Sequence, residues 1–352
     1  MGYFLLSAPQ FGKLPEGKRL ERILKSPNYK NGEFQNLSLT PTMSPDGSML
    51  KLLYRMYIKP EKDRNPKVKF DFRKTDLNSL NPKENLLIWM GHSSYYLQLD
   101  GKKILVDPVF TGNAAPFSFM VKAFEGSDLY SSQDIPNLDY LIITHDHWDH
   151  LDYATVKNLF PKLEKVITGL GTGAHLEYWG LEEEKIIELD WGESQQLENG
   201  FTVYGETARH FSGRGLKRNQ SLWMSFVLES PNKKVYIGGD SGYGAHFKEI
   251  GRKHDSIDLA ILENGQYNEH WKNIHFLPGE NLQALEDLNA KAMLPVHYGK
   301  FALALHPWQE PIRELMKFKK PNQTVYTPMP GTVLYWDQNQ AAPLEPWWET
   351  VK

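Results

Sequence analysis

The sequence predicts a layered α/β domain, and three observations carry this prediction. Short apolar or alternating segments, typical of β-strands, follow one another closely from residue 85 onward. Segments with helical periodicity lie between some of them. Strand-like segments dominate before residue 250, whereas strands and helices share the remainder, and such a mixture is typical of sheets covered by helices.

The expected strands and helices follow from these patterns. Asp100-Gly101 separates two strand-like segments and favours a two-residue hairpin turn, because both central positions of that turn need a positive φ. The segment LDYLIIT, which ends at Thr144, is apolar enough for a buried strand. Helical patterns cover residues 153–160 and 279–288. Strands are expected at residues 86–90, 95–99, 103–106, 138–144, 166–170, 202–204, 221–228, 235–238, 259–262 and 292–296.

The N-terminal part of the chain has a different character. Residues 1–84 are polar, rich in Pro, Lys and Asn, and weakly periodic. The stretch KPEKDRNPKVK at residues 59–69 is typical of a solvated connection. We therefore predict an N-terminal extension, residues 1–84, packed on a main domain of residues 85–352. Such an extension could shape the entrance to a substrate site.

The composition narrows the classes of function. A formal net charge of −3 over 352 residues argues against a nucleic-acid-binding protein that relies on bulk positive charge. The chain has no cysteine, so any metal site must use His, Asp and Glu. No stretch approaches the roughly 20 apolar residues of a membrane span. The run YFLLSA at residues 3–8 is too short for a signal-peptide core unless it is the remnant of a trimmed one, so soluble, peripheral-membrane and cell-envelope locations all stay open.

The segment ITHDHWDHLD, residues 142–151, carries the strongest functional signal. His145, His147 and His150 fall within six residues, with Asp146 and Asp149 among them. Residues i and i+2 of an extended segment point the same way, so His145 and His147 can bind one ion. The turn into the next helix can direct Asp149 and His150 toward a second ion. These ligand types suit Zn²⁺, Mn²⁺ or Fe, while a single-metal site and a solvated loop are the alternatives.

Three further candidate ligands follow strand-like segments. Asp240 ends VYIGGD, where an apolar strand runs into Gly-Gly, and a carboxylate there can bridge two metals or cap the next turn. His210 ends FTVYGETARH, and His297 ends AKAMLPVH. Each histidine alone would more often be packed or exposed. Together with the cluster they favour a metal site.

These residues resemble a known family. The segment THDHWDH at residues 144–150 matches the HxHxDH signature of the metallo-β-lactamase superfamily, and His210, Asp240 and His297 follow in that family's order. The resemblance covers about residues 85–335. Within the superfamily, five blocks resemble N-acylphosphatidylethanolamine-hydrolysing phospholipase D and its bacterial relatives: WMGHSSYYLQLDGKKILVDPVF (89–110), ARHFSGRG (208–215), LWMSFVLE (222–229), GGDSGYGAHFKEIG (238–251) and LPVHYGKFALALH (294–306).

The resemblance implies a four-layer αβ/βα sandwich with the site at one edge of the two sheets. It also implies two zinc ions, for which manganese or iron are alternatives. The implied ligands are His145, His147 and His210 for the first metal, Asp149, His150 and His297 for the second, and Asp240 as the bridge.

The implied activity is that of a phosphodiesterase of phospholipase D type acting on N-acylphosphatidylethanolamine or a related lipid. A hydroxide shared by the metals would attack, with Asp149 and Asp240 among the catalytic residues. A lactonase or other carboxyl-ester or amide hydrolase, similar to sugar-phosphate lactonases, is the alternative, and a non-catalytic metal-binding sensor is a third. The expected partners are a lipid or small phosphodiester and a membrane surface but no nucleic acid, and a homodimer is left open.

Several residues near these blocks are candidates for substrate contact. His275 in NIHFLPGE faces the substrate phosphate according to the resemblance, which makes it a catalytic and substrate-binding candidate, with a structural role in a helix-entry loop as the alternative. Arg214 could bind a phosphate through its planar guanidinium, although an exposed ion pair is the commoner role. Tyr243, Trp148 and Phe301 could line an acyl pocket, with ordinary packing as the alternative.

Two more residues are interpreted as supports of the site. His92 in MGHSS is expected to be mainly structural. Asp107 in LVDP is expected to hydrogen-bond a ligand histidine from behind and so to orient its ring.

Overall fold

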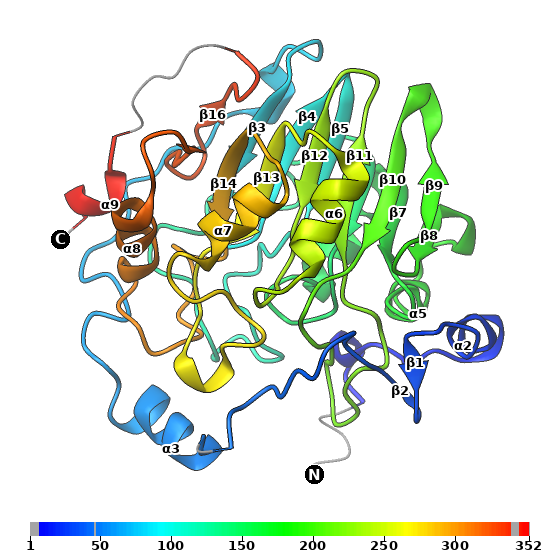
Figure 1. Cartoon of the computed structure of the whole chain (residues 1–352), viewed down its shortest axis with the longest axis horizontal. Coiled ribbons are helices and arrows are strands. Elements are labelled where there is room, and N and C mark those ends of the chain that lie inside the picture. Colours follow the sequence, from blue (N-terminus) through cyan, green and yellow to red (C-terminus); the bar gives the residue numbers. More distant parts are fainter. Residues whose placement is uncertain (1–6, 46, 339–344, 352) are drawn as a thin grey trace.

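The computed structural model shows two β-sheets packed face to face and flanked by helices (Figure 1). It describes residues 7–45, 47–338 and 345–351, so most of the apolar run at residues 3–8 lies outside the described part. Each large sheet has seven strands. The layered α/β sandwich expected from the sequence is therefore confirmed.

The first sheet has the strand order β16-β3-β4-β5-β6-β7-β8. Its strands β16 to β5 pair antiparallel, whereas β5 to β8 run parallel. The turn between β4 and β5 has φ values of 43° at Asp100 and 82° at Gly101, as a hairpin of this type requires. The strands are β3 (Leu86–Trp89), β4 (Tyr95–Leu99), β5 (Lys102–Val106), β6 (Leu138–Ile143), β7 (Leu163–Gly169), β8 (Ile186–Leu189) and β16 (Val333–Leu334).

The second sheet has the order β15-β14-β13-β12-β11-β10-β9. Its strands β9 to β12 pair antiparallel, and β12 to β15 run parallel. A separate pair of short strands, β1 (Tyr29–Lys30) and β2 (Glu33–Phe34), precedes both sheets. The strands of the second sheet are β9 (Ser194–Gln196), β10 (Thr202–Glu206), β11 (Ser225–Glu229), β12 (Lys234–Ile237), β13 (Leu259–Glu263), β14 (Ala292–Val296) and β15 (Thr324–Val325).

Helices cover the sheets through their apolar faces. Leu159 and Leu176, from α4 and α5, join the cluster on the outer face of the first sheet. Ile250, Leu285 and Leu315, from α6, α7 and α8, belong to the large core cluster that contains the second sheet. The α-helices are α2 (Gly17–Ile23), α3 (Met49–Leu53), α4 (Tyr153–Leu159), α5 (Gly173–Tyr178), α6 (His246–His254), α7 (Glu280–Asp287), α8 (Glu310–Phe318) and α9 (Trp347–Thr350), and a π-helical turn, Tyr54–Ile58, continues α3.

The central strands β3, β4, β13 and β14 are mostly apolar along their length and buried on both faces, whereas the edge strand β9 is polar and exposed. In β3, Leu86 and Ile88 belong to the outer cluster, whereas Leu87 and Trp89 belong to the large core cluster. This period of two is the geometry of an extended strand. Burial on both faces replaces the usual polar alternation by nearly continuous apolar runs, which is why these strands could be recognised in the sequence.

The helix expected at residues 153–160 is α4, and together with α5 it supplies the crossovers that the parallel strands β6, β7 and β8 need. One detail of the expected fold is wrong, because the strand expected at residues 221–228 begins only at Ser225. Residues before it leave the sheet, and the N–H groups of Leu222 and Met224 donate to the carbonyls of Leu170 and Thr144 on the first sheet's side at 2.8 and 2.9 Å.

The described N-terminal residues lie against the loops at the carboxyl ends of the strands. Phe34 is fully buried within the large core cluster. The side chain of Asn36 donates to the carbonyl of His210 at 2.7 Å, and the N–H of Ser44 donates to the carbonyl of His270 at 2.6 Å. Among the residues that the structure describes, no helix has both the length and the apolar character needed to cross a membrane.

Candidate metal centre

The first group of candidate ligands consists of three histidines from two loops. His145 and His147 follow β6, and His210 follows β10. His145 Nε2 lies 2.9 Å from His147 Nδ1, which lies 3.2 Å from His210 Nε2. The three nitrogens therefore point at one place, within the spacing that a shared ion allows.

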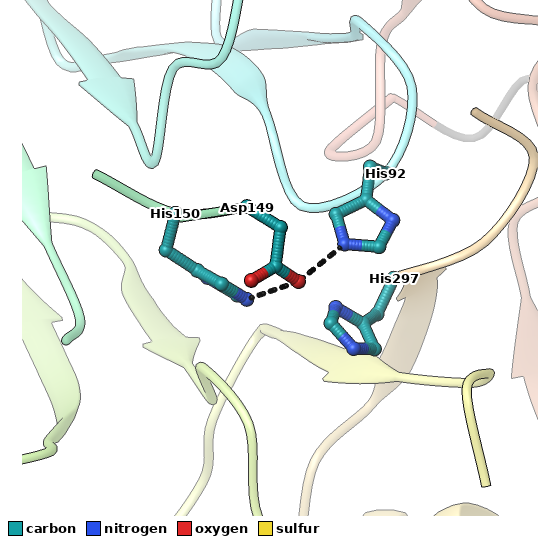
Figure 2. A group of neighbouring side chains, drawn as sticks. All are labelled: His92, Asp149, His150 and His297. Atoms are coloured by element: carbon teal, nitrogen blue, oxygen red, sulfur yellow. Dashed lines mark hydrogen bonds and ion pairs between the residues drawn. The ribbon is translucent and has the colours of Figure 1, made fainter. Parts of the chain in front are cut away.

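The second group lies beside it and contains Asp149, His150, His297 and also His92 (Figure 2). His92 follows β3 and His297 follows β14, so the two sheets contribute to the same cluster. His92 Nε2 lies 2.9 Å from Asp149 Oδ2, and His150 Nε2 lies 3.5 Å from the same oxygen. The structure thus places His92, which we interpreted as structural, in direct contact with a candidate ligand.

Asp240 lies between the two groups. Its Oδ2 atom is 3.2 Å from His150 Nε2, 3.7 Å from His210 Nε2 and 3.8 Å from His145 Nε2. Its other oxygen, Oδ1, is 3.2 Å from His297 Nδ1. One carboxylate therefore faces ligands of both groups, which is the position that a bridging ligand needs.

Hydrogen bonds on the far side of the rings determine which nitrogens carry protons. His210 Nδ1 donates to the carbonyl of Ile274 at 2.8 Å, so its Nε2 atom has a free lone pair. His150 Nδ1 donates to Asp107 Oδ2 at 2.7 Å, which leaves its Nε2 atom unprotonated in the neutral ring. Asp107 also accepts from the hydroxyl and N–H of Thr144, at 2.7 and 2.8 Å. The supporting role expected for Asp107 is what this geometry provides.

These residues fit bound metal ions. His150 Nε2 and Asp240 Oδ1 are buried and have no hydrogen-bond partner within the described part of the chain. Lone pairs of neutral histidines and carboxylate oxygens would repel one another at these distances, and buried polar groups are rarely left without a partner. A cation between them removes both problems, and His and Asp donors suit zinc.

The electrostatics of the cluster favour a cation as well. Burial lowers the pKa of His145, His210 and His297 well below the ordinary value, so these rings are neutral and can coordinate. His150 behaves differently: burial opposes its protonation, but the carboxylates, chiefly that of Asp240, outweigh burial and raise its pKa well above the ordinary value. The cluster therefore attracts positive charge to the point where the two groups meet.

The backbone at the cluster adopts conformations that few residues tolerate. His92, Asp107 and His297 have φ values of 52°, 42° and 66°. A positive φ at a residue other than glycine costs of order 1–3 kcal/mol and persists only where the surroundings impose it. Here the N–H of His297 donates to the carbonyl of His92 at 2.9 Å, and the N–H of His92 donates to the carbonyl of Tyr298 at 3.0 Å. The two sheets thus hold each other's ligands in place.

The candidate ligands form the floor of a pocket of about 290 Å³. His147, Asp149, His210, Asp240 and His297 line this floor, together with His275. The walls are mostly apolar and come from distant parts of the chain: Met43, Leu52, Phe211, Trp271, Ile274 and Leu303. The N-terminal extension thereby supplies part of the pocket wall.

The remaining substrate candidates lie elsewhere. The Arg214 guanidinium is buried and donates to the carbonyls of Gln10, Asp146 and Leu151, and it stacks 4.0 Å from the ring of Trp148. It is not the exposed ion pair considered above, and it does not line the metal pocket. Tyr243 donates to Asp287 at 2.5 Å and does not line the pocket.

Phe301 is also packed outside the pocket. It is buried in a small cluster with Val109 and Ala114. Its ring lies edge-on to His92 with centroids 5.2 Å apart. Phe301 therefore supports the ring of His92 from behind and leaves the acyl-pocket role to other residues.

Sequence reasoning missed two residues of the site, Glu263 and Arg218. Glu263 ends β13 and contacts His275, with Nδ1 of the histidine 2.6 Å from Oε2. Burial raises the pKa of Glu263 to about 7. Arg218 lines the pocket and lies over the ring of Phe211. A carboxylate that ends an apolar strand, LAILE, is the same signal that identified Asp240, so Glu263 could have been found in the same way.

Comparisons with known proteins agree with the fold and the cluster. Residues 102–298 match the family model described as a beta-lactamase superfamily domain. The chain is 35% identical over 329 residues to the uncharacterized protein Rv0906 of Mycobacterium tuberculosis. This match covers 92% of this chain and 88% of that protein. It is 31% identical over 246 residues to N-acyl-phosphatidylethanolamine-hydrolyzing phospholipase D 1 of Caenorhabditis elegans, covering 65% of this chain and 68% of that protein.

A solved structure shows the same architecture. Igni18, a metallo hydrolase from Ignicoccus hospitalis, superposes with a TM-score of 0.54 at 20% sequence identity. The match covers 71% of this chain and 97% of that chain. At this identity the likeness concerns the fold alone.

Proposed function

We propose that this chain, which belongs to the metallo-β-lactamase superfamily and is a metal-dependent hydrolase, cleaves a phosphodiester bond in an N-acylated phospholipid or a related lipid. The observation that carries this proposal is the contrast within one pocket: a floor of histidines and carboxylates beneath apolar walls. A polar headgroup fits the floor, and acyl chains fit the walls. The similarity to the nematode phospholipase D supports the same substrate class.

Two zinc ions are the proposed cofactors. His145, His147 and His210 would hold one, Asp149, His150 and His297 the other, and Asp240 would contact both. When bound, such ions lower the pKa of a shared water from about 15.7 to near 7 and neutralise charge on the phosphoryl oxygens.

The protein's own side chains would position the substrate and move the proton. Arg218, at the pocket wall, supplies a cation for the phosphate. Nε2 of His275 takes up the proton that the attacking water releases and passes it to the departing alcohol. The water oxygen bonds to phosphorus as its proton moves to Nε2 of His275. The bond from phosphorus to the alcohol oxygen then breaks, and that oxygen takes the proton from His275, which returns to its neutral form.

Hydrolysis of matched substrates tests this proposal. We expect the zinc-loaded protein to cleave bis(4-nitrophenyl) phosphate and an N-acylphosphatidylethanolamine presented in mixed micelles, and to lose both activities on chelation. Metal content is measured first, and fewer than one metal per chain in carefully prepared protein would contradict a two-metal centre. Turnover of a lactone without turnover of either diester would instead establish the carboxyl-ester alternative.

A membrane surface is the proposed partner, and one exposed patch supports it. The α3 patch consists of Leu50, Leu53, Tyr54 and Ile58, which are 81%, 43%, 51% and 72% exposed. Leu52, on the same helix, lines the metal pocket, so the patch lies beside the pocket entrance. The exposed basic residues within and after it, such as Lys51, suit an anionic lipid surface.

Charges placed in the α3 patch should weaken vesicle binding. Leu50→Asp combined with Ile58→Asp should reduce binding to phosphatidylcholine–phosphatidylglycerol vesicles at least about tenfold, because each leucine-sized side chain contributes roughly 1.5–3 kcal/mol when it leaves water. Hydrolysis of the soluble diester should not change. Leu24→Asp combined with Val68→Asp, at exposed apolar positions outside the patch, is the matched control. Equal binding by both double variants would rule the patch out.

A further inference from the structure

Glu263 is a buried carboxylate at the pocket for which the mechanism above has no use. It ends β13 and is 1% exposed. Its Oε1 atom accepts from the N–H groups of Ser241 and Phe276, both at 3.1 Å. Its Oε2 atom lies 2.6 Å from Nδ1 of His275. The two backbone bonds fix the carboxylate, so Oε2 has a set direction toward the histidine.

The ring of His275 is held on its faces as well. It stacks on His297 with an interplanar angle of 19° and centroids 5.3 Å apart, and it lies edge-on to His210 at 5.1 Å. His275 itself lines the metal pocket. With Nδ1 engaged by Glu263, the nitrogen left for the pocket is Nε2.

We propose that Glu263 is a positioning residue: it holds His275 in the tautomer with the proton on Nδ1 and thereby presents Nε2 to the reacting phosphate. This inference rests on the proposed function for the reaction, but the tautomer itself does not depend on the substrate. In this tautomer Nε2 can take up the proton released by the water and pass it to the departing alcohol oxygen. A proton on Nε2 of the resting, neutral ring would block that uptake.

A role as an additional metal ligand is the competing explanation for Glu263, because its carboxylate lies with Asp240, His275 and His297 within ligand spacing. Two backbone donors use both lone pairs of Oε1, whereas Oε2 accepts one hydrogen bond from His275 and has a second lone pair. Metal content therefore separates the two roles.

The first experiment observes the tautomer directly. Zinc-loaded protein with ¹⁵N-labelled histidine is examined by long-range ¹H–¹⁵N NMR, and His275→Gln identifies the signals of this ring by their loss. We expect the wild-type ring to be protonated on Nδ1, and Glu263→Ala to give a mixture of tautomers with zinc content unchanged. A resting Nε2–H tautomer in the wild type, or an unchanged tautomer in Glu263→Ala, would overturn the inference even if no diester is a substrate.

The second experiment is a double-mutant cycle on kcat with bis(4-nitrophenyl) phosphate. Glu263→Gln should lower kcat about tenfold with little change in KM, because an amide holds the ring less firmly. In a His275→Ala background the same substitution should have no further effect, since its target is gone. Additive losses, or loss of zinc in Glu263→Gln, would show that Glu263 acts on the metals or the fold.

The chain offers a matched control for both experiments. Glu206 is a second buried glutamate that accepts from a histidine, His254 Nε2, at 2.7 Å. It ends β10 and does not line the metal pocket. Glu206→Gln should change neither the tautomer of His275 nor kcat, so an effect as large as that of Glu263→Gln would identify a general response to losing a buried carboxylate.

Discussion

Asp240→Asn should lower kcat/KM for diester hydrolysis by roughly 10²–10³-fold and reduce the zinc bound per chain. The carboxylate of Asp240 faces His145, His150 and His210 through one oxygen and His297 through the other. Asparagine keeps the shape but has a single acceptor oxygen and no charge. One of the two groups of ligands therefore loses its shared anion, and the spacing between the metals is no longer fixed.

The measurement combines metal analysis by mass spectrometry with steady-state kinetics on the same preparation. Asp258→Asn is the control, because Asp258 lies just before β13, at the opposite end of the strands from the site, where it accepts from the N–H of Lys234. That variant should keep its zinc and its activity. Full zinc content together with full activity in Asp240→Asn would refute the bridging role.

The site could be located from the sequence because of how this fold places its ligands. His145, His210, Asp240 and His297 each follow a strand that is recognisable from its apolar residues. Strands that run in the same direction end at the same edge of a sheet, and ligands of α/β proteins bind at such carboxyl ends. At these positions, the apolar strand pattern in the sequence and the strand order in the fold therefore both indicate where the ligands lie.

The walls of the pocket could not be predicted in this way. Met43 and Leu52 lie in a region without clear periodicity, and they meet Phe211 and Trp271 only through tertiary contacts between distant parts of the chain. An apolar residue in a loop carries no signal of what it will face. The shape and apolar character of the pocket walls therefore became visible only in the structure, whereas the candidate ligands of the floor could be named from the sequence.

Arg214 shows why residue type alone misleads. A guanidinium near the metal motif suggests a phosphate contact, yet this one is 4% exposed and binds three backbone carbonyls. Two of those carbonyls belong to the metal-binding loop itself, at Asp146 and Leu151, so Arg214 holds the shape of that loop. Arg218, four residues later, lines the pocket instead. The turn between them decides which arginine lines the metal pocket, and no local pattern encodes it.

Asp107→Asn should weaken zinc binding by about 10–100-fold, although Asp107 does not face the metals in the proposed site. The carboxylate accepts three hydrogen bonds: from His150 Nδ1 at 2.7 Å and from the hydroxyl and N–H of Thr144 at 2.7 and 2.8 Å. An asparagine has one acceptor oxygen, so its NH₂ group must face a donor on either His150 or Thr144. Either orientation leaves a buried donor without a partner, which costs about 1–3 kcal/mol.

The effect on the metal follows from the ring of His150. When the amide NH₂ group faces His150, Nδ1 must accept instead of donate, so the ring proton moves to Nε2 and removes the lone pair that faces Asp240. The free zinc concentration that half-saturates each protein is measured by competition with a chelator of known affinity. Asp139→Asn is the control, since Asp139 lies on β6 but binds Lys102 and the N–H of Lys103 at the opposite end of that strand from the site. Equal zinc affinity in Asp107→Asn and Asp139→Asn would mean that the orientation of His150 is set by Thr144 and the surrounding backbone alone.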